Sequence, residues 1–348
     1  MLERLASSVG EWLRGGPEGD VVVSSRVRLA RNVSGYPFLP KADPGQTSEV
    51  EGLLRDSIMS CRLGVELTYC RLDEASPLLR ELLVERHLIA RDHAWADWVR
   101  AVAFGPQEKL SLMVNEEDHL RVQVLAGGLQ LVQAWEEVSR VDDLLAELIP
   151  FAFSASYGYL TACPTNVGTG MRASVMLHLP ALVMAQEMDK VIELAHTRHL
   201  AVRGLYGEGT HASADLYQVS NQVSLGVSEE DILEEVGQAV SEIVELEREG
   251  REGLLTRNRP ELEGCIEQAL EMLRSAWSLS SEEALHLLSQ VRLGVYAGLA
   301  KGVTAETLSG LFLLTLPAHL QTIEGSELEG LERDQVRAAL LKKRLMEN

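Results

Sequence analysis

The sequence has no long apolar run, no secretion signal and no closely spaced cysteine pair. Its 348 residues contain no stretch of about 18 or more apolar residues, which a membrane-spanning helix requires. The N-terminal segment MLERLASSVGEWLRGG carries charges and lacks the apolar core and cleavage site of a signal peptide. The 4 cysteines (Cys61, Cys70, Cys163 and Cys265) form no CxxC pair, which argues against a structural zinc site and for a reducing compartment. We therefore expect a cytoplasmic protein without a membrane span, with one large domain and a smaller one.

Positive charge and lysine are scarce. Acidic residues outnumber basic ones by 52 to 32, which gives a formal net charge of -20. This balance disfavours direct nucleic-acid binding, which needs a basic face, and it suits a basic partner, although solubility alone also explains it. Only 6 of the 32 basic residues are lysines and 26 are arginines. Arginine is the better bidentate ligand for phosphate, and codon bias is the alternative explanation.

The common motifs for nucleotide and metal binding are absent. The chain has no GxxxxGK[ST] loop and no protein-kinase combination of glycine-rich loop, HRD and DFG. The glycine-rich stretch GLYGEG (204–209) is by itself a weak phosphate-loop motif. His196 and His199 lie three residues apart on an expected helix, but no third ligand is evident, so no metal site is expected. A protein of this sequence that handles ATP must hold the phosphates with arginines.

Periodicity predicts a mixed domain followed by a helical one. Alternating or continuous apolar residues predict strands at 21–28, 110–114, 120–125, 172–179 and 215–226. Helical spacing is found at 47–63, 76–90, 128–149, 180–199 and 228–252. The last of these begins at a capping box with Ser228 as N-cap and Asp231 three residues later. We expect an N-terminal segment (1–20), a catalytic domain (21–255) and a helical domain (256–348) suited to dimerisation or regulation.

Several arginines stand in the expected strands or at loop edges. Side chains alternate along a strand, so Arg26 and Arg28 share one face. Two adjacent arginines repel each other unless an anion lies between them, although a solvated face is the alternative reading. The same arrangement recurs at Arg121, Arg172 and Arg203. Together these five residues can bind phosphate oxygens and neutralise the charge that develops during phosphoryl transfer.

Carboxylates and a cysteine accompany the arginines. The turn NEED (115–118) holds three acidic residues, and Glu208 lies in the glycine-rich stretch. Cys163 opens the segment CPTNVGTGMRAS (163–174), which ends shortly after Arg172. Two carboxylates can grip a planar guanidinium and remove its proton, and a thiolate adds a further negative contact. A basic acceptor is therefore consistent with this set, whereas carboxylates on turns are otherwise solvated or capping groups.

Four segments taken together resemble the catalytic domain of the phosphagen kinases, the family of arginine and creatine kinases. They are SSRVR (24–28), NEEDHLRV (115–122), CPTNVGTGMRAS (163–174) and VRGLYGE (202–208). They occur in the order of the family and cover roughly residues 21–250. The resemblance implies an α+β fold with an antiparallel sheet flanked by helices. It also implies ATP as phosphoryl donor, with Mg²⁺ bridging the phosphates and few or no protein ligands to the metal.

The resemblance also implies roles for individual residues. Glu117 and Glu208 would grip the acceptor guanidinium, with Glu117 as general base, and Cys163 would orient it. The nucleotide-binding residues would be Ser24, Ser25, Arg26, Val27, Arg28, His87, Arg121, Arg172, Ala173, Ser174, Val175, Met176, Arg203, Gly204, Leu205, Tyr206, Gly207 and Glu208. His211, where relatives are expected to carry a Ser-Glu-Ala-like run, departs from the family pattern and puts loop closure or substrate preference in doubt.

Within the family the likeness is strongest to the bacterial protein arginine kinases of the McsB type. SSRVR begins at residue 24, which leaves no room for the N-terminal helical domain that closes over free substrates in other members. The acceptor is then an arginine on a protein surface. RDQVRA (333–338) resembles the allosteric phosphoarginine pocket of these kinases and would contribute Arg333, Asp334, Arg337 and Ala338, although an ordinary charged helix end is the alternative reading.

The resemblance further implies partners and a cellular role. The substrates would be proteins with exposed arginines, such as the basic repressor CtsR or misfolded proteins, marked for degradation in a stress response. An activator (McsA) and the Clp chaperone–protease are expected partners, and a homodimer is the expected assembly. Two other functions stay open: a kinase for a free guanidino compound, and a non-catalytic adaptor that binds phosphoarginine.

Overall fold

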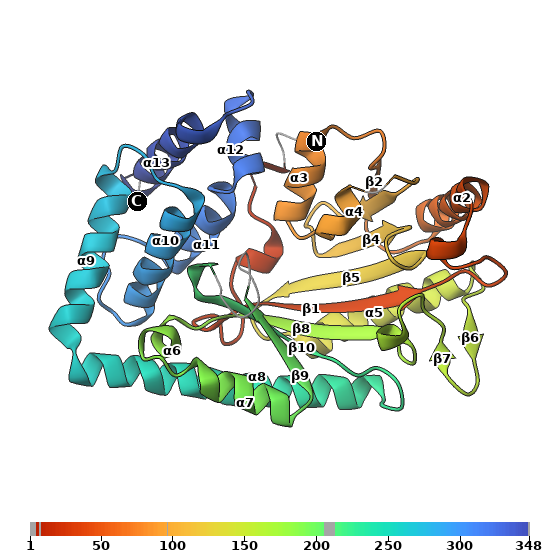
Figure 1. The fold of residues 1–348 in the computed structure, drawn as a ribbon, viewed down its shortest axis with the longest axis horizontal. Helices are drawn as coiled ribbons and strands as arrows, with labels where there is room; N and C mark the ends of the chain where they lie inside the picture. Colours follow the sequence, from red (N-terminus) through yellow and green to blue (C-terminus); the bar gives the residue numbers. More distant parts are fainter. Residues whose placement is uncertain (1–4, 7, 96, 205–212, 347–348) are drawn as a thin grey trace.

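An eight-stranded antiparallel sheet lies at the centre of the computed structural model (Figure 1). The structure describes all residues except 1–4, 7, 96, 205–212 and 347–348. The strands are, in order across the sheet, β2 (Thr68–Arg71), β3 (Ala101–Phe104), β4 (Leu110–Val114), β5 (Leu120–Gly127), β1 (Val22–Arg31), β8 (Met171–His178), β10 (Leu216–Asn221) and β9 (Leu200–Gly204). Every neighbouring pair runs antiparallel. The predicted α+β class, with an antiparallel sheet flanked by helices, is confirmed.

One face of the sheet is apolar and covered by helices. Val27 and Leu29 point to this face and are fully buried. The covering helices are α2 (Pro44–Ser60), α5 (Leu131–Ala146), α7 (Met188–Thr197) and α8 (Glu229–Arg257). Each helix presents apolar residues three or four positions apart to the sheet, as in α5, whose buried residues include Ala134, Val138 and Val141. Burial of this face supplies the main stabilisation of the fold.

Two helices predicted as continuous are interrupted. The predicted helix at 76–90 ends early as α3 (Pro77–Glu85), because His87 adopts a left-handed backbone with φ 57°. A short helix, α4 (Arg91–Ala94), follows. The predicted helix at 180–199 is divided into α6 (Pro180–Met184) and α7 at Gln186, whose φ is 58°. A left-handed residue cannot continue a right-handed helix, so both single-helix predictions are wrong.

Other elements follow the sequence closely. Strands β4 and β5 flank the predicted turn, and Asn115 begins that turn with a φ of 56°. The capping box of α8 is confirmed, because Ser228 and Asp231 exchange side-chain to backbone hydrogen bonds of 3.0 and 3.1 Å. The sequence pattern does not predict β2, β3 or β9. These strands are four or five residues long and the AVAF segment of β3 is buried throughout, so neither alternation nor length distinguishes them.

All regular elements described after β10 are helices. They are α8, α9 (Arg259–Ser275), α10 (Ser281–Tyr296), α11 (Ala305–Leu314), α12 (Pro317–Glu324) and α13 (Gly330–Met346). The last five gather beside one end of the sheet (Figure 1). They share an apolar cluster with the sheet and with the N-terminal turn η1 (Glu11–Leu13), including Trp12, Leu216 and Leu313. The helical region therefore packs directly on the segment that carries the site. No helix among the described residues has the length and apolar character to cross a membrane.

Arg31, at the end of β1, holds several elements together from a buried position. Its guanidinium donates to the Asp142 carboxylate of α5 at 2.7–3.1 Å and to the carbonyl oxygen of Thr169 at 3.0 Å. It also lies 3.4 Å from the centre of the Tyr159 ring. Both members of the ion pair are at least nine-tenths buried. Arg31 thus fixes the loop before β8 against the edge of the sheet.

Replacing Asp142 tests this arrangement. Asp142→Ala leaves the Arg31 guanidinium buried without its counter-charge, so we expect a loss of about 3–5 kcal/mol of unfolding free energy. Urea denaturation followed by circular dichroism measures it. The matched control is Asp143→Ala, the exposed neighbour on the same helix, which should change the unfolding free energy by less than about 0.5 kcal/mol. Equal effects of the two variants would show that the ion pair contributes nothing.

Candidate active site

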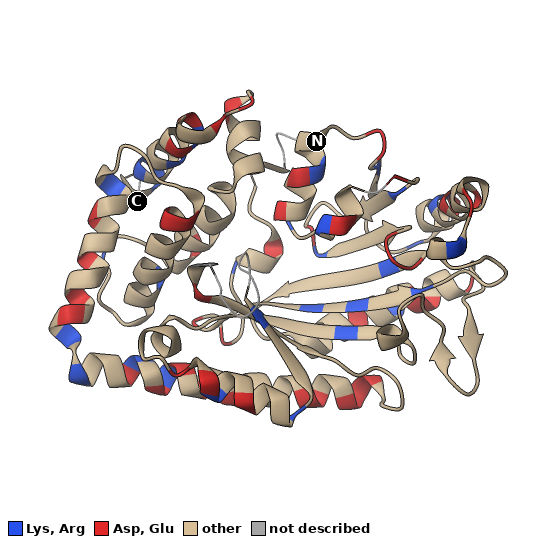
Figure 2. Cartoon of the chain, viewed as in Figure 1, with Lys and Arg blue, Asp and Glu red and all other residues tan. Residues whose placement is uncertain are grey.

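The five predicted arginines lie on one face of the sheet, opposite the apolar core. Directly paired residues of an antiparallel sheet point to the same side. Arg28 pairs with Gln123 on β5 and with Arg172 on β8. Along the same face Arg26 pairs with Ser174, Arg121 with Ala30, and Arg203 with Gln218. Figure 2 shows basic residues on these central strands. The sequence expectation of a shared arginine surface is met by the backbone register.

These arginines, called here the arginine face, destabilise one another electrostatically. Burial, together with the charges of Arg172 and Arg121, lowers the pKa of Arg26 to about 10. Burial and the same kind of repulsion lower the pKa of Arg28 and of Arg172. Guanidinium groups this close to one another favour an anion that would lie between them.

Polar partners on this face are few. Arg26 donates to the Gln218 side chain at 3.1 Å and Arg172 to the Ser220 hydroxyl at 3.0 Å. The Nε atoms of Arg28 and Arg172 are buried and have no hydrogen-bond partner among the described residues. These free donors and the shared positive charge fit a polyphosphate. Within the described part of the chain no group of three His, Cys, Asp or Glu side chains could hold a metal ion.

Not every predicted nucleotide-binding residue presents its side chain to this face. Ser24 and Ser174 share the arginine face. Ser25 points to the other side, where its hydroxyl donates to the Gly128 carbonyl at 2.7 Å and accepts from the Gln130 amide at 2.9 Å at the start of α5. The side chains of three further residues are fully buried in the apolar core, so only their backbones can approach a ligand: Val27, Ala173 and Val175.

The predicted general base lies at one end of the arginine face. Glu117 sits in the turn between β4 and β5 and is 44% exposed. Its carboxylate is 3.2 Å from Arg121, which also pairs with Glu116 at 2.7 Å. Arg121 therefore joins the arginine face to the acidic turn, a contact that the sequence spacing does not reveal.

Cys163 is brought to the same end of the sheet. Asp118, also in the acidic turn, accepts a hydrogen bond of 2.7 Å from the backbone amide of Ala162, the residue before Cys163. The same carboxylate oxygen accepts from Asn32, which directly follows β1, at 2.7 Å. The thiol of Cys163 lies 3.0 Å from the hydroxyl of Thr165. Asp118 and Asn32 are positioning residues that sequence reasoning did not single out for this task, and their only sequence signal is adjacency to the motifs.

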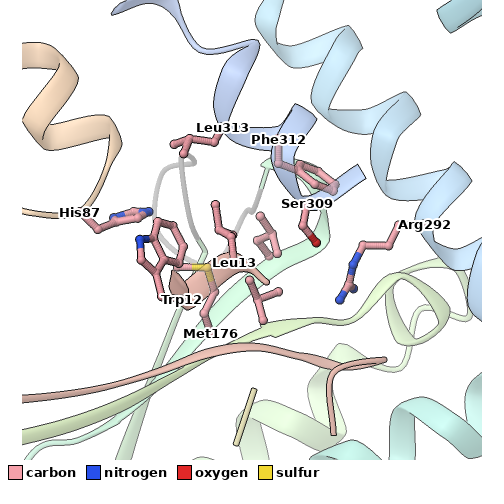
Figure 3. Close-up of a pocket in the computed structure, with 10 residues that line it drawn as sticks. Trp12, Leu13, His87, Met176, Arg292, Ser309, Phe312 and Leu313 are labelled. Atoms are coloured by element: carbon pink, nitrogen blue, oxygen red, sulfur yellow. The ribbon is translucent and has the colours of Figure 1, made fainter. Parts of the chain in front are cut away.

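An apolar pocket lies at the opposite end of the arginine face. Figure 3 shows the predicted residues His87 and Met176 lining it with Trp12 and Phe312, which were not predicted. The rings of Trp12 and His87 meet edge to face at 5.2 Å. Burial, with a contribution from the charge of Arg26, lowers the pKa of His87 to about 3, so its ring is neutral at physiological pH. Because Trp12 and Phe312 come from the two ends of the chain, no local motif could indicate them.

Part of the predicted site cannot be placed. Gly204 ends β9, and Arg203 is exposed at the margin of a polar cavity that also contains Arg172, Asn166 and Gln222. Four predicted residues, together with His211, lie outside the described residues: Leu205, Tyr206, Gly207 and Glu208.

The RDQVRA segment lies on α13, away from the arginine face. Arg337 is buried and donates to the carbonyl oxygens of Thr315 at 2.9 Å and Leu279 at 2.7 Å, and it pairs with Asp334. Ala338 is buried in the helical core. Arg333 instead lines a separate pocket whose other charged residues include Arg91, Glu85 and Glu282. The four residues are thus divided between the packing of the helices and an open pocket.

Comparisons with known proteins agree along the chain. The family model described as "ATP:guanido phosphotransferase, C-terminal catalytic domain" matches residues 49–250, and "Protein-arginine kinase McsB C-terminal domain" matches residues 259–348. Two curated relatives are named protein-arginine kinase. The one from Halothermothrix orenii is 46% identical over 339 residues, covering 97% of each chain. The one from Symbiobacterium thermophilum is 44% identical over 349 residues, covering 99% of this chain and 98% of the relative.

Solved structures show the same likeness. The duplicated taurocyamine kinase from Schistosoma mansoni, with bound transition state analog components, has a TM-score of 0.61 and 29% identity. The match covers 70% of this chain and 35% of that longer, duplicated chain. A crystal structure of lombricine kinase has a TM-score of 0.59 and 27% identity, and the match covers 70% of each chain.

Neutralising one arginine tests the repulsion on the arginine face. Arg28→Met keeps the length of the side chain and removes a buried, poorly paired charge. We expect the ligand-free protein to gain about 1–3 kcal/mol of unfolding free energy, and the rise in melting temperature on adding ATP to shrink or vanish. Differential scanning calorimetry with and without ATP measures both effects. The control Arg62→Met, exposed beyond α2, should alter neither. An Arg28→Met protein that is less stable yet still stabilised by ATP would contradict the account.

Proposed function

This chain belongs to the ATP:guanido phosphotransferases and, within them, to the protein-arginine kinases, and from this membership we propose how its own residues phosphorylate arginine side chains in proteins. The enzyme is a phosphotransferase with a nitrogenous acceptor. The observation that carries the proposal is the order of features along one sheet face: an apolar pocket at one end, buried arginines in the middle, and Glu117 with Cys163 at the other end.

ATP lies along this face in the proposal. The base enters the apolar pocket beside His87 and Met176, and the phosphates lie over Arg26, Arg28 and Arg172. Phosphate oxygens would supply the partners that the buried Nε atoms of Arg28 and Arg172 do not have among the described residues. Mg²⁺, which the family generally uses, would be carried by the phosphates and supply further charge neutralisation.

The acceptor guanidinium lies between Glu117 and Cys163. Glu117 takes a proton from the attacking nitrogen, the nitrogen–phosphorus bond forms, and the bond from the γ-phosphorus to the bridging oxygen breaks to release ADP. Arg121, 3.2 Å from Glu117, lies where it can neutralise charge on the transferring group. Glu208 completes the acceptor site in this proposal by analogy with the family.

The helical region is proposed to be regulatory. The open pocket beside Arg333 would take phosphoarginine, with Arg333 on the phosphate, while Arg337 supports the pocket from the helical core. A homodimer assembled through these helices, a cytoplasmic location, and basic or misfolded protein substrates are part of the same proposal. So are an activator protein and a chaperone–protease that receives the marked substrates. The formal charge of -20 supports basic partners.

Glu117→Gln tests the chemistry. We expect kcat toward an arginine-rich protein to fall by roughly 10²–10⁴-fold, because the amide cannot accept the proton. The change should leave the affinity for ATP within about threefold, since Arg26, Arg28 and Arg172 remain. Mass spectrometry that preserves the acid-labile nitrogen–phosphorus bond measures the product. Near-normal phosphorylation by Glu117→Gln would refute the base assignment, and product mainly on added free arginine would assign the enzyme to small guanidino substrates.

Arg333→Ala tests the regulatory pocket. We expect the affinity for free phosphoarginine to fall about tenfold or more, because the arginine that faces the open pocket is lost. Isothermal titration calorimetry measures it, and Lys342→Ala, exposed on the same helix, is the control. If Arg333→Ala binds phosphoarginine as tightly as Lys342→Ala does, the pocket assignment fails.

A further inference from the structure

Large apolar side chains are exposed around the acceptor end of the site. Phe153 and Tyr157, in the hairpin of β6 (Phe153–Ser154) and β7 (Gly158–Tyr159), are 62% and 60% exposed. In the loop 222–227 three more are exposed, namely Val223, Leu225 and Val227. We call these five residues the apolar platform. Single exposed apolar residues are ordinary, whereas a cluster beside a catalytic site indicates an interaction surface.

The two parts of the platform are joined through the segment that begins at Cys163. Tyr159 and Gly168 exchange backbone hydrogen bonds of 2.8 and 3.2 Å. On the other side, the Ser224 hydroxyl donates to the carbonyl oxygens of Thr165 at 2.7 Å and Val167 at 2.9 Å. The hairpin, the Cys163 segment and the loop 222–227 therefore lie side by side, with Cys163 at the start of the middle layer.

The layers approach too closely to allow independent movement. A side-chain carbon at Gly168 would lie 2.1 Å from the Ser224 carbonyl oxygen, and one at Gly158 would lie 2.5 Å from the Gly168 carbonyl oxygen. Both glycines have positive φ, of 113° and 74°. Arg31 stacks on Tyr159 from below and fixes the hairpin to the sheet. The platform is thus held in place before any partner arrives, which lowers the entropy cost of binding.

Acidic residues border the platform. Helix α8 follows the loop 222–227 directly and carries Glu229, Glu230 and Asp231 in its first turn. A mostly apolar groove, lined in part by Val223, Val227, Asp231 and Glu235, meets the catalytic cavity at Asn221. The surface therefore combines apolar contact with negative charge and is continuous with the place where the acceptor arginine must enter.

We propose that the apolar platform binds the acceptor protein itself, through apolar side chains that flank the target arginine on an extended segment. This inference rests on the proposed function. An arginine in the catalytic cavity and an apolar residue within about three positions of it are separated by up to about 10 Å of extended chain, which keeps the flanking residue close to the site. The acidic border favours a segment that is also cationic. Arginines in apolar, extended segments are therefore the preferred acceptors.

Two arginine peptides of equal length and charge test the proposal, one with leucines two residues either side of a single arginine and one with serines there. With wild-type enzyme we expect kcat/KM for the leucine peptide to exceed that for the serine peptide by about tenfold or more, mostly through KM. The double variant Val223→Ser/Leu225→Ser should bring this ratio near one without changing kcat/KM for the serine peptide. Phe153→Ser, on the other side of the Cys163 segment, should lower the ratio independently.

Met272→Ser is the control, because Met272 is equally exposed on α9 outside the platform. It should keep the wild-type ratio, and melting temperatures should confirm that every variant is folded. A wild-type ratio within twofold of one, or a ratio that survives in both platform variants, would overturn the proposal. Failure of the wild-type enzyme to phosphorylate either peptide, while it binds ATP, would instead overturn the proposed function.

Discussion

Mutual repulsion among the arginines on one sheet face is the constraint on which the rest of this structure depends. Four of the five are partly buried, and burial lowers the pKa of Arg26, Arg28 and Arg172. Such a cluster costs free energy in the absence of an anion, so the fold must supply stability elsewhere. It does so on the opposite face of the same strands, where apolar residues pack against α2, α5, α7 and α8. One sheet thus separates the stabilising surface from the reactive one.

The same strands also determine the direction of the reaction. The pocket beside His87 lies at one end of the arginine face, and the acidic turn and Cys163 lie at the other. Two buried contacts fix the acceptor end: Arg31 with Asp142, and Asp118 with the amide of Ala162. Neither contact needs to touch a substrate. Each holds a loop against the sheet, and the alignment of donor and acceptor follows from that rigidity.

Much of this arrangement could be predicted from the sequence, because it depends on local pattern. Alternation placed Arg26 and Arg28 on one face, and the register of the sheet then brought Arg121, Arg172 and Arg203 to the same side. The features that escaped prediction depend on long-range contacts. Trp12 and Phe312 meet beside His87 from opposite ends of the chain, and the pairing of Arg121 with Glu117 requires the actual shape of the turn. The helices at 76–90 and 180–199 failed as single elements because one left-handed residue interrupts each, which periodicity does not detect.

The central claim is that phosphates bind the arginine face while the acceptor guanidinium lies between Glu117 and Cys163. A crystal structure of the enzyme with ADP, Mg²⁺, nitrate and an arginine peptide tests it most directly, because nitrate can take the place of the transferring phosphoryl group. The account predicts phosphate oxygens within hydrogen-bond distance of the guanidinium nitrogens of Arg26, Arg28 and Arg172, and the peptide guanidinium against the Glu117 carboxylate. Phosphates bound away from these arginines, or a peptide arginine at a distance from Glu117, would contradict it.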